Sequence, residues 1–191
     1  MRVAVVGSSG SGKSTFARRL GEALSLPAIE LDAINWQAGW RDLATRDPEE
    51  FGRRVEAAIA GRGWVTDGNY SLVLPRILAR ATDVVWLDYG RSVIMRRVLR
   101  RSFVRSLTRK EVWPGTGNVE TWRTWLDKEH PVRWAWDNFD RRRARFEEAF
   151  ADERLSHVAV RRLRHPRAAE PLIQRLSREN TAEVRAEMGL D

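Results

Sequence analysis

The chain has 191 residues, the size of one ordinary domain, and is long enough to bury a hydrophobic core. It contains no cysteine, which excludes disulfide bonds and thiolate metal sites, and no apolar run approaches the length of a membrane span. The chain begins with a strand pattern rather than a signal peptide, so we expect a cytoplasmic protein without a membrane partner.

The basic residues exceed the acidic ones, with a formal net charge of +8, and nearly all of them are arginine because lysine occurs only at positions 13, 110 and 128. Arginine binds phosphate through two parallel hydrogen bonds, which suits an enzyme that handles nucleotides. A general preference for arginine on the surface would look the same. The charge permits a nucleic-acid partner, but no DNA or RNA recognition motif supports one. We expect a monomer.

The first predicted element is a buried strand over residues 2–6, and a phosphate-binding loop of the pattern G-x-x-x-x-G-K-[ST] follows it directly. Phe16, Leu20 and Leu24 then recur at helical spacing, so the loop lies between a strand and a helix, as this motif requires. The loop residues are Gly7, Ser8, Ser9, Gly10, Ser11, Gly12, Lys13, Ser14 and Thr15.

These residue types suit the binding of ATP with Mg²⁺. Glycines let several backbone N–H groups point at one phosphate, and the helix adds the positive end of its dipole. Lys13 provides a charge that reaches the β- and γ-phosphates, and Ser14 provides a hydroxyl for Mg²⁺. The loop therefore predicts a nucleoside-triphosphate site, and it leaves open which molecule receives the phosphate.

A second short strand is predicted over residues 28–31, and Asp32 follows at its carboxyl end. Ligands of open α/β sheets bind beyond this edge, so Asp32 is a candidate for the acceptor site, although an aspartate there could also only cap a turn. Residues 33–46 show no period and are expected to form a loop over the acceptor. Its candidate contacts are Asn35, Trp36 and Trp40.

Asp47 and Pro48 predict the start of a helix, which Gly61 and Gly63 end. A third strand follows over residues 64–67, and Asp67 at its end is the expected second group for Mg²⁺. Further candidate acceptor residues follow this strand, namely Asn69, Tyr70 and, in a helical stretch up to residue 81, Arg76. A fourth buried strand is predicted over residues 83–88.

An arginine-rich helix is predicted over residues 91–109, with Val93, Val98, Leu99 and Phe103 as its buried stripe. A loop rich in glycine and proline follows it, and a second basic helix covers about 132–150. This arrangement suggests a lid over roughly residues 105–140 that closes arginines over phosphates. A fifth strand over 157–160 and a last helix over about 167–176 complete a domain of residues 1–175, and a polar tail covers 176–191.

Nine tryptophans are unusual for this length, and most of them lie in two polar stretches of the chain. They could stack on a base or close a cleft, and they could equally cover a small core under the lid. Those in the polar stretches are Trp36, Trp40, Trp113, Trp122, Trp125, Trp134 and Trp136.

The combination of strand, P-loop, Asp32, Asp67-Gly68 and an arginine-bearing helix resembles the adenylate kinase branch of the P-loop kinases over residues 1–175. The chain is most similar to a small bacterial group described as adenylate-kinase-related or "DNA topology modulation" proteins. That group shares the pairs Leu31-Asp32 and Gly39-Trp40 and the run from Trp64 to Tyr70.

The resemblance implies an α/β three-layer sandwich of P-loop NTPase type, with a five-stranded parallel sheet and an arginine-rich helical lid. It implies that Arg97 stacks on adenine, that Arg101 contacts phosphates, and that Arg141 or Arg142 returns from the lid. His165 and Pro166 resemble the loop that borders the adenine.

The sequence departs from adenylate kinases after the first helix, where the segment that binds AMP is replaced by residues 32–36. We therefore expect an ATP-dependent kinase whose acceptor is a small molecule, possibly a nucleotide or nucleoside. Its catalytic candidates are Lys13, Asp32, Arg97, Arg101 and Arg141. Asp32 would act as a base toward an alcohol, or would only position a monophosphate or the metal. The alternative is a nucleotide-binding regulator of DNA topology without kinase activity.

Overall fold

The computed structural model describes residues 1–108, 111–113, 115–119 and 131–187. Its centre is a five-stranded sheet in the order β2-β5-β1-β6-β7, in which every neighbouring pair of strands is parallel. The strands are β1 (Arg2–Gly7), β2 (Ala28–Glu30), β5 (Trp64–Asp67), β6 (Asp83–Leu87) and β7 (Ala159–Leu163). The predicted sheet is thereby confirmed.

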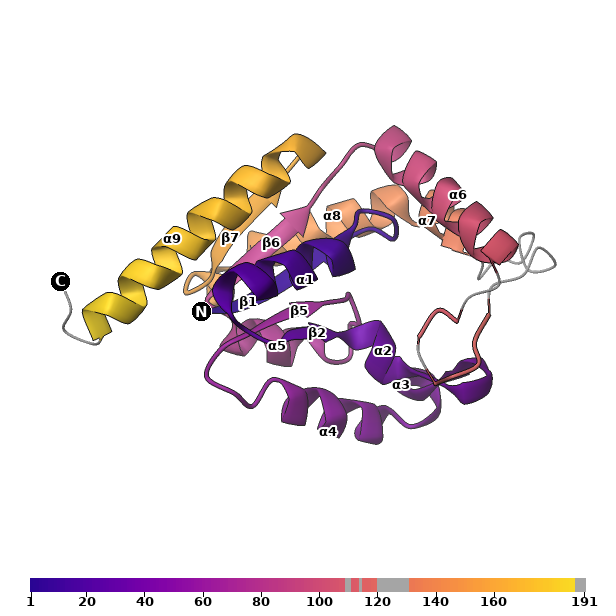
Figure 1. The fold of residues 1–191 in the computed structure, drawn as a ribbon, viewed down its shortest axis with the longest axis horizontal. Helices are drawn as coiled ribbons and strands as arrows, with labels where there is room; N and C mark the ends of the chain where they lie inside the picture. Colours follow the sequence, from indigo (N-terminus) through magenta and orange to yellow (C-terminus); the bar gives the residue numbers. More distant parts are fainter. Residues whose placement is uncertain (109–110, 114, 120–130, 188–191) are drawn as a thin grey trace.

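Helices cover both faces of this sheet and make three layers (Figure 1). One face packs against α1 (Lys13–Leu24), α6 (Arg91–Thr108), α7 (Pro131–Asp137) and α9 (Ala169–Glu187). The other packs against α3 (Leu43–Arg46), α4 (Pro48–Ala58), α5 (Leu74–Arg80) and α8 (Phe139–Phe150). Burial on both faces explains why β1 and β6 are continuous apolar runs without alternation.

The start of α4 follows the capping pattern that the sequence predicts. Asp47 accepts a hydrogen bond from the backbone N–H of Glu50 at 3.0 Å, and Pro48 occupies the first turn, as predicted. Residues 33–46, which we expected to be an irregular loop, instead contain short elements. These are α2 (Leu31–Asn35), β3 (Trp36–Gln37), the 3₁₀ turn η1 (Ala38–Trp40), β4 (Arg41–Asp42) and α3.

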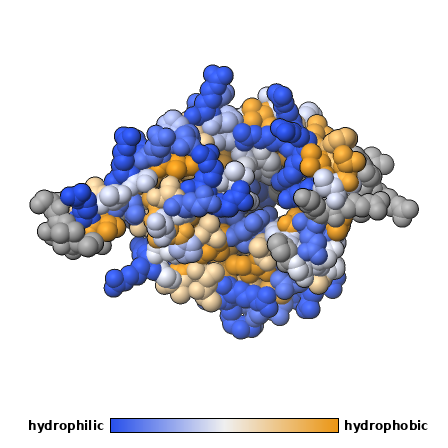
Figure 2. Space-filling view, in the orientation of Figure 1, coloured by the Kyte–Doolittle hydropathy of each residue, from blue (hydrophilic) through white to orange (hydrophobic). Residues whose placement is uncertain are grey.

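The buried stripe predicted for α6 is partly wrong. The structure buries Ile94 and Val98, and Ser102 and Ser106 continue that face, whereas Leu99 and Phe103 are 43% and 52% exposed. Residues four apart share one face of a helix, and here the face with the serines packs inward. The exposed apolar side chains of α6 gather in a patch at the upper right of the molecule (Figure 2).

Several boundaries also differ from the prediction. The basic helix over 132–150 is two helices, α7 and α8, separated at Asn138, and the last strand begins at Ala159 rather than at position 157. The polar tail is helical as far as Glu187, because α9 continues beyond residue 176. The part of the predicted lid between residues 120 and 130, which includes Trp122 and Trp125, lies outside the described residues. No described helix is long and apolar enough to cross a membrane.

Candidate active site

The phosphate-binding loop connects β1 to α1 at the carboxyl edge of the sheet. Gly10 and Gly12 have φ angles of 83° and 91°, in the left-handed region that glycine adopts without strain. A Cβ on Gly10 would lie 2.2 Å from Cγ2 of Val98, so the loop packs directly against α6. Asn69 fixes the start of the loop, since its amide group donates to the carbonyl of Gly7 and accepts from the Gly7 N–H at 3.2 Å.

Lys13 points back over its own loop, and its Nζ donates to the carbonyl of Ser8 at 3.2 Å. Burial lowers the pKa of Lys13 from 10.5 to about 8, although the carboxylates of Asp32 and Asp67 oppose this change. The ammonium group is thus held in a site that favours a nearby anion. A phosphate oxygen is the anion that this loop geometry accommodates.

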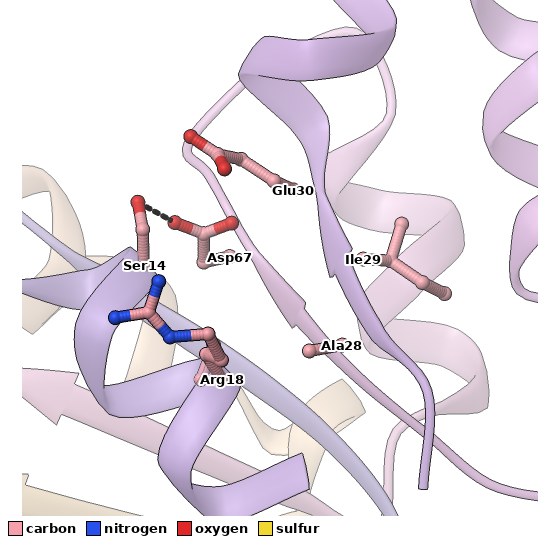
Figure 3. A pocket seen from close by; sticks show the side chains of 7 residues that line it. Ser14, Arg18, Ala28, Ile29, Glu30 and Asp67 are labelled. Atoms are coloured by element: carbon pink, nitrogen blue, oxygen red, sulfur yellow. Dashed lines mark hydrogen bonds between the residues drawn. The ribbon is translucent and has the colours of Figure 1, made fainter. Parts of the chain in front are cut away.

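Ser14 and Asp67, the residues expected to hold Mg²⁺, meet beside the loop, where the Ser14 hydroxyl donates to Oδ2 of Asp67 at 2.5 Å (Figure 3). Burial raises the pKa of Asp67 to about 6, against the opposing effects of Ser14 and Lys13. Glu30 is the register partner of Asp67 on β2 and lines the same small pocket. A hydroxyl and two carboxylates are oxygen donors of the kind that Mg²⁺ prefers, so these residues fit the expected ion.

A cleft of about 1030 Å³ opens beside the loop, between the start of α1, α6 and the residues after β2 and β5. Its mouth is surrounded by hydrophilic side chains (Figure 2). Ser9 to Thr15 line it, and so does Pro166. This size exceeds that of most single-ligand pockets, and it leaves room for a nucleotide and a second small molecule.

Three arginines of α6 enter the cleft at four-residue spacing, at positions 97, 101 and 105. Arg97 donates from Nη1 to the carbonyl of Ser11 at 2.9 Å, and its guanidinium lies 5.3 Å from the ring centre of Tyr89. Arg101 donates to Oγ of Ser9 at 3.4 Å. The structure therefore brings Arg97 and Arg101 onto the loop from one helix face.

The other half of the cleft is built around Asp32. The Tyr70 hydroxyl donates to Oδ1 of Asp32 at 2.7 Å, and the pKa of Tyr70 is raised by burial and by the neighbouring Asp32 charge. Arg142 of α8 faces the same carboxylate. Burial and then the neighbouring Arg145 lower the pKa of Arg142 to about 10, while Asp32 opposes the change. Trp36 and Asp42 complete this half, which we call the acceptor half.

Two predicted acceptor residues lie outside the cleft. Arg76 on α5 is exposed and donates to Glu56 of α4 at 2.7 Å, so its charge is directed to the molecular surface. Asn35 is fully buried, and its Oδ1 accepts from the N–H of Ala44 at 2.8 Å. Neither residue is an acceptor contact in this structure, because Arg76 joins α5 to α4 and Asn35 joins α2 to α3.

Three further candidates are placed differently from the prediction. Arg141 is exposed and hydrogen-bonds the side chain of Asn138, whereas the neighbouring Arg142 lines the cleft. Trp40 is 42% exposed and is not among the cleft-lining residues, although its ring meets that of Trp36, which lines the cleft. His165 is exposed and accepts from the N–H of Arg167 at 3.2 Å, so it caps the turn before α9.

The cleft also contains residues that the sequence did not single out, namely Glu30, Asp42, Tyr89 and Arg105. Glu30 could have been noticed, because it precedes Asp32 by two positions at the same strand end. Asp42 and Tyr89 carry no such signal. Asp42 enters the site only because it pairs with Trp36 across a two-residue ladder.

No protein-family model and no curated protein sequence matches the chain. Solved structures do match it over nearly its whole length. The shikimate kinase from Acinetobacter baumannii, in complex with shikimate, has a TM-score of 0.53 and 18% identity, with 95% of this chain and 93% of that chain covered. The shikimate kinase from Bacteroides thetaiotaomicron has a TM-score of 0.54 and 15% identity, with coverages of 93% and 97%.

A gluconokinase from Sinorhizobium meliloti 1021 has a TM-score of 0.51 and 18% identity, and 95% of this chain and 96% of that chain are covered. At these identities the likeness concerns the fold. The chain shares with these solved kinases an α/β fold around a five-stranded parallel sheet, as the sequence predicted for its architecture. The finer resemblance to adenylate-kinase-related or "DNA topology modulation" proteins stays a prediction.

Proposed function

We propose that this protein is an ATP-dependent phosphotransferase that uses Mg²⁺ and transfers the γ-phosphate to a hydroxyl group of a small molecule. The observation that carries the proposal is the pairing, in one cleft, of the phosphate-binding loop with a carboxylate on the opposite side. Lys13 and Asp32 are close enough that the Asp32 charge opposes the lowering of the Lys13 pKa that burial causes. The fold that the chain shares with small-molecule kinases supports this reading.

In the proposed reaction, Asp32 accepts the proton of the acceptor hydroxyl while the hydroxyl oxygen forms a bond to the γ-phosphorus. The bond between that phosphorus and the bridging oxygen breaks, and ADP leaves with the bonding electrons. Lys13 and Arg101 neutralise the charge on the transferred group. Ser14 and Asp67 would hold Mg²⁺, which would supply positive charge beside the phosphates.

The acceptor half favours a hydroxyl over a phosphate as the attacking group. Asp32 and Asp42 bring two carboxylates to this end of the cleft, and two negative charges repel a monophosphate. The Tyr70 hydroxyl donates to Oδ1 of Asp32 at 2.7 Å and orients the carboxylate. Trp36 presents an aromatic wall, which suits a ring-bearing acceptor.

The test is an ADP-release assay with Mg²⁺-ATP and five acceptors: adenosine, AMP, shikimate, D-gluconate and glycerol. We expect turnover with a hydroxyl acceptor. In the Asp32→Asn variant that turnover should fall ~10²–10⁴-fold with unchanged ATP affinity, because the shape is kept and the base is lost. Asp47→Asn is the matched control, since asparagine caps α4 as well as aspartate does and Asp47 does not line the cleft. An Asp32→Asn variant as active as the wild type would refute the base.

AMP in the panel also tests the finer resemblance to adenylate-kinase-related proteins, since turnover with AMP alone would favour it over a hydroxyl acceptor. We propose that the protein acts as a cytoplasmic monomer, and light scattering of the purified chain tests the second point. The alternative role in DNA topology rests on the net charge of +8, and no feature of the described residues adds to it.

A further inference from the structure

Asn118 is a fully buried polar residue that the proposed reaction does not use. It is 1% exposed, and its side chain bonds to a strand residue and to a turn residue of the small hairpin that follows α2. The N–H of Trp40 donates to Oδ1 of Asn118 at 2.8 Å, and Nδ2 of Asn118 donates to the carbonyl of Gln37 at 3.0 Å. Both ends of one amide group are therefore committed to residues about eighty positions earlier in the chain.

The hairpin that receives these bonds comprises residues 36–42, and we call it the acceptor hairpin. Its turn is strained, because Trp40 has a φ angle of 57°, which a residue with a side chain seldom adopts. Such a conformation persists only where the surroundings hold it. Asn118 holds the turn at the strained residue itself.

Three tryptophans reinforce the same contact. Trp113 stacks on Trp36, with ring centres 6.2 Å apart and an angle of 18° between the planes. Trp40 meets both rings edge-on, at 5.8 Å from Trp36 and 5.9 Å from Trp113. The indole N–H of Trp113 also donates to Glu30 at 3.4 Å. Residues 111–113 and 115–119 are thus joined to the acceptor hairpin by stacking and by hydrogen bonds.

The joined surface lies beside the acceptor half of the cleft. Trp36 and Asp42 of the hairpin and Val112 of the later segment all line the cleft. The backbone N–H of Val112 donates to the carbonyl of Asn118 at 2.9 Å, so Asn118 connects these two walls. A change at Asn118 must therefore reach the surface that contacts the acceptor.

We propose that Asn118 is a positioning residue that sets acceptor selectivity, by locking residues 111–113 and 115–119 onto the acceptor hairpin and fixing the Trp36 ring as a cleft wall. The inference rests on the proposed function. The other half of the cleft, where we propose that ATP binds, is formed by the phosphate-binding loop and α6. The two hydrogen bonds of the Asn118 side chain go to neither of these elements. A loss of Asn118 should therefore affect the acceptor and spare the nucleotide.

The experiment compares Asn118→Ala with the wild type and with Asn180→Ala, a matched change on α9 outside the cleft. For the acceptor in the five-compound panel with the fastest turnover, we expect the KM of Asn118→Ala to rise about tenfold, since the Trp40 N–H and the Gln37 carbonyl lose their partner. We expect kcat and the ATP dissociation constant to stay within about threefold of the wild type, because the reacting groups are untouched.

A second measurement needs no acceptor and follows the contact of residues 111–113 and 115–119 with the acceptor hairpin. Stacked indoles give a coupled signal in far-ultraviolet circular dichroism, and Trp113→Phe identifies the part that comes from the Trp36–Trp113 pair. We expect Asn118→Ala to lose that part. A retained signal, or a lost signal with an unchanged acceptor KM, would overturn the inference.

The two proposals fail separately. If the wild type turns over none of the panel compounds, the proposed function fails and acceptor selectivity fails with it, while the dichroism still shows whether Asn118 locks the tryptophans. If turnover is normal and Asn118→Ala changes kcat and KM equally for ATP and the acceptor, the proposed function stands. In that case Asn118 has only a structural role.

Discussion

Replacing Lys13 with methionine should abolish phosphoryl transfer and at the same time stabilise the ligand-free protein. Activity should be lost because the ammonium group serves the β- and γ-phosphates. Stability should rise because the folded protein holds a charged group whose burial lowers its pKa from 10.5 to about 8. Methionine fills similar space without a charge to desolvate.

The magnitude follows from that pKa. One pH unit corresponds to about 1.4 kcal/mol, so a lysine fully shielded from water would cost the folded state about 3 kcal/mol at neutral pH. Lys13 lines an open cleft, where water screens part of the charge, and we expect about 1–3 kcal/mol. For a domain of this length, that corresponds to a rise of roughly 2–10 °C in Tm.

The gain in stability of Lys13→Met over the wild type should decrease as the pH rises. Below pH 8 the lysine is charged in both the folded and the unfolded chain, so the full cost is present. Between about 8 and 10.5 the folded protein releases its proton first, and the advantage of methionine declines.

Thermal unfolding of Lys13→Met and of the wild type at several pH values measures this difference in stability. The control is Arg62→Met, because Arg62 is an exposed basic residue in the turn before β5. An unchanged or lower Tm at pH 7, or a gain that does not decline above pH 8, would refute the reasoning.

Three further predictions concern the charged groups around the cleft. Arg97→Ala should weaken ATP binding by ~1–3 kcal/mol through lost stacking, whereas Arg101→Ala should mainly lower kcat; a change confined to KM in both variants would contradict these roles. Because the pKa of Asp67 is raised to about 6, protons should compete with Mg²⁺ below that pH, and the Mg²⁺ requirement measured from pH 5 to 8 should rise toward the acid side. Asp67→Asn should weaken Mg²⁺ binding at every pH and remove this dependence. Arg76→Ala should leave turnover unchanged and alter the free energy of unfolding by less than about 1 kcal/mol, because its ion pair with Glu56 is exposed; a large loss of turnover would return it to the site.

The sequence alone determined the sheet and the phosphate-binding loop motif at one end of the cleft. A strand buried on both faces must be a continuous apolar run, so residues 2–6 and 83–88 could be assigned by composition alone. The phosphate-binding loop is local, since its glycines, Lys13 and Ser14 act within nine consecutive residues. Asp67 followed from its place at a strand end, and the structure brings it to Ser14 at 2.5 Å.

Tertiary packing decided the acceptor half. The run of arginines at positions 141–143 does not reveal which side chain points inward, because consecutive helical residues point about 100° apart and all three are arginine. Phe139 and Phe146 of α8 are buried in the two cores, and their burial sets the rotation of the helix. That rotation brings Arg142 into the cleft and leaves Arg141 exposed.

The contacts of Asn118 also could not be predicted from the sequence, because they join segments far apart in the chain. Its partners, Gln37 and Trp40, lie about eighty residues earlier, and no periodicity or motif connects the two segments. In the folded chain, residues 115–119 lie beside the residues that follow α2 (Figure 1). Only the tertiary structure brings the Trp40 N–H, the Gln37 carbonyl and the Asn118 amide together there.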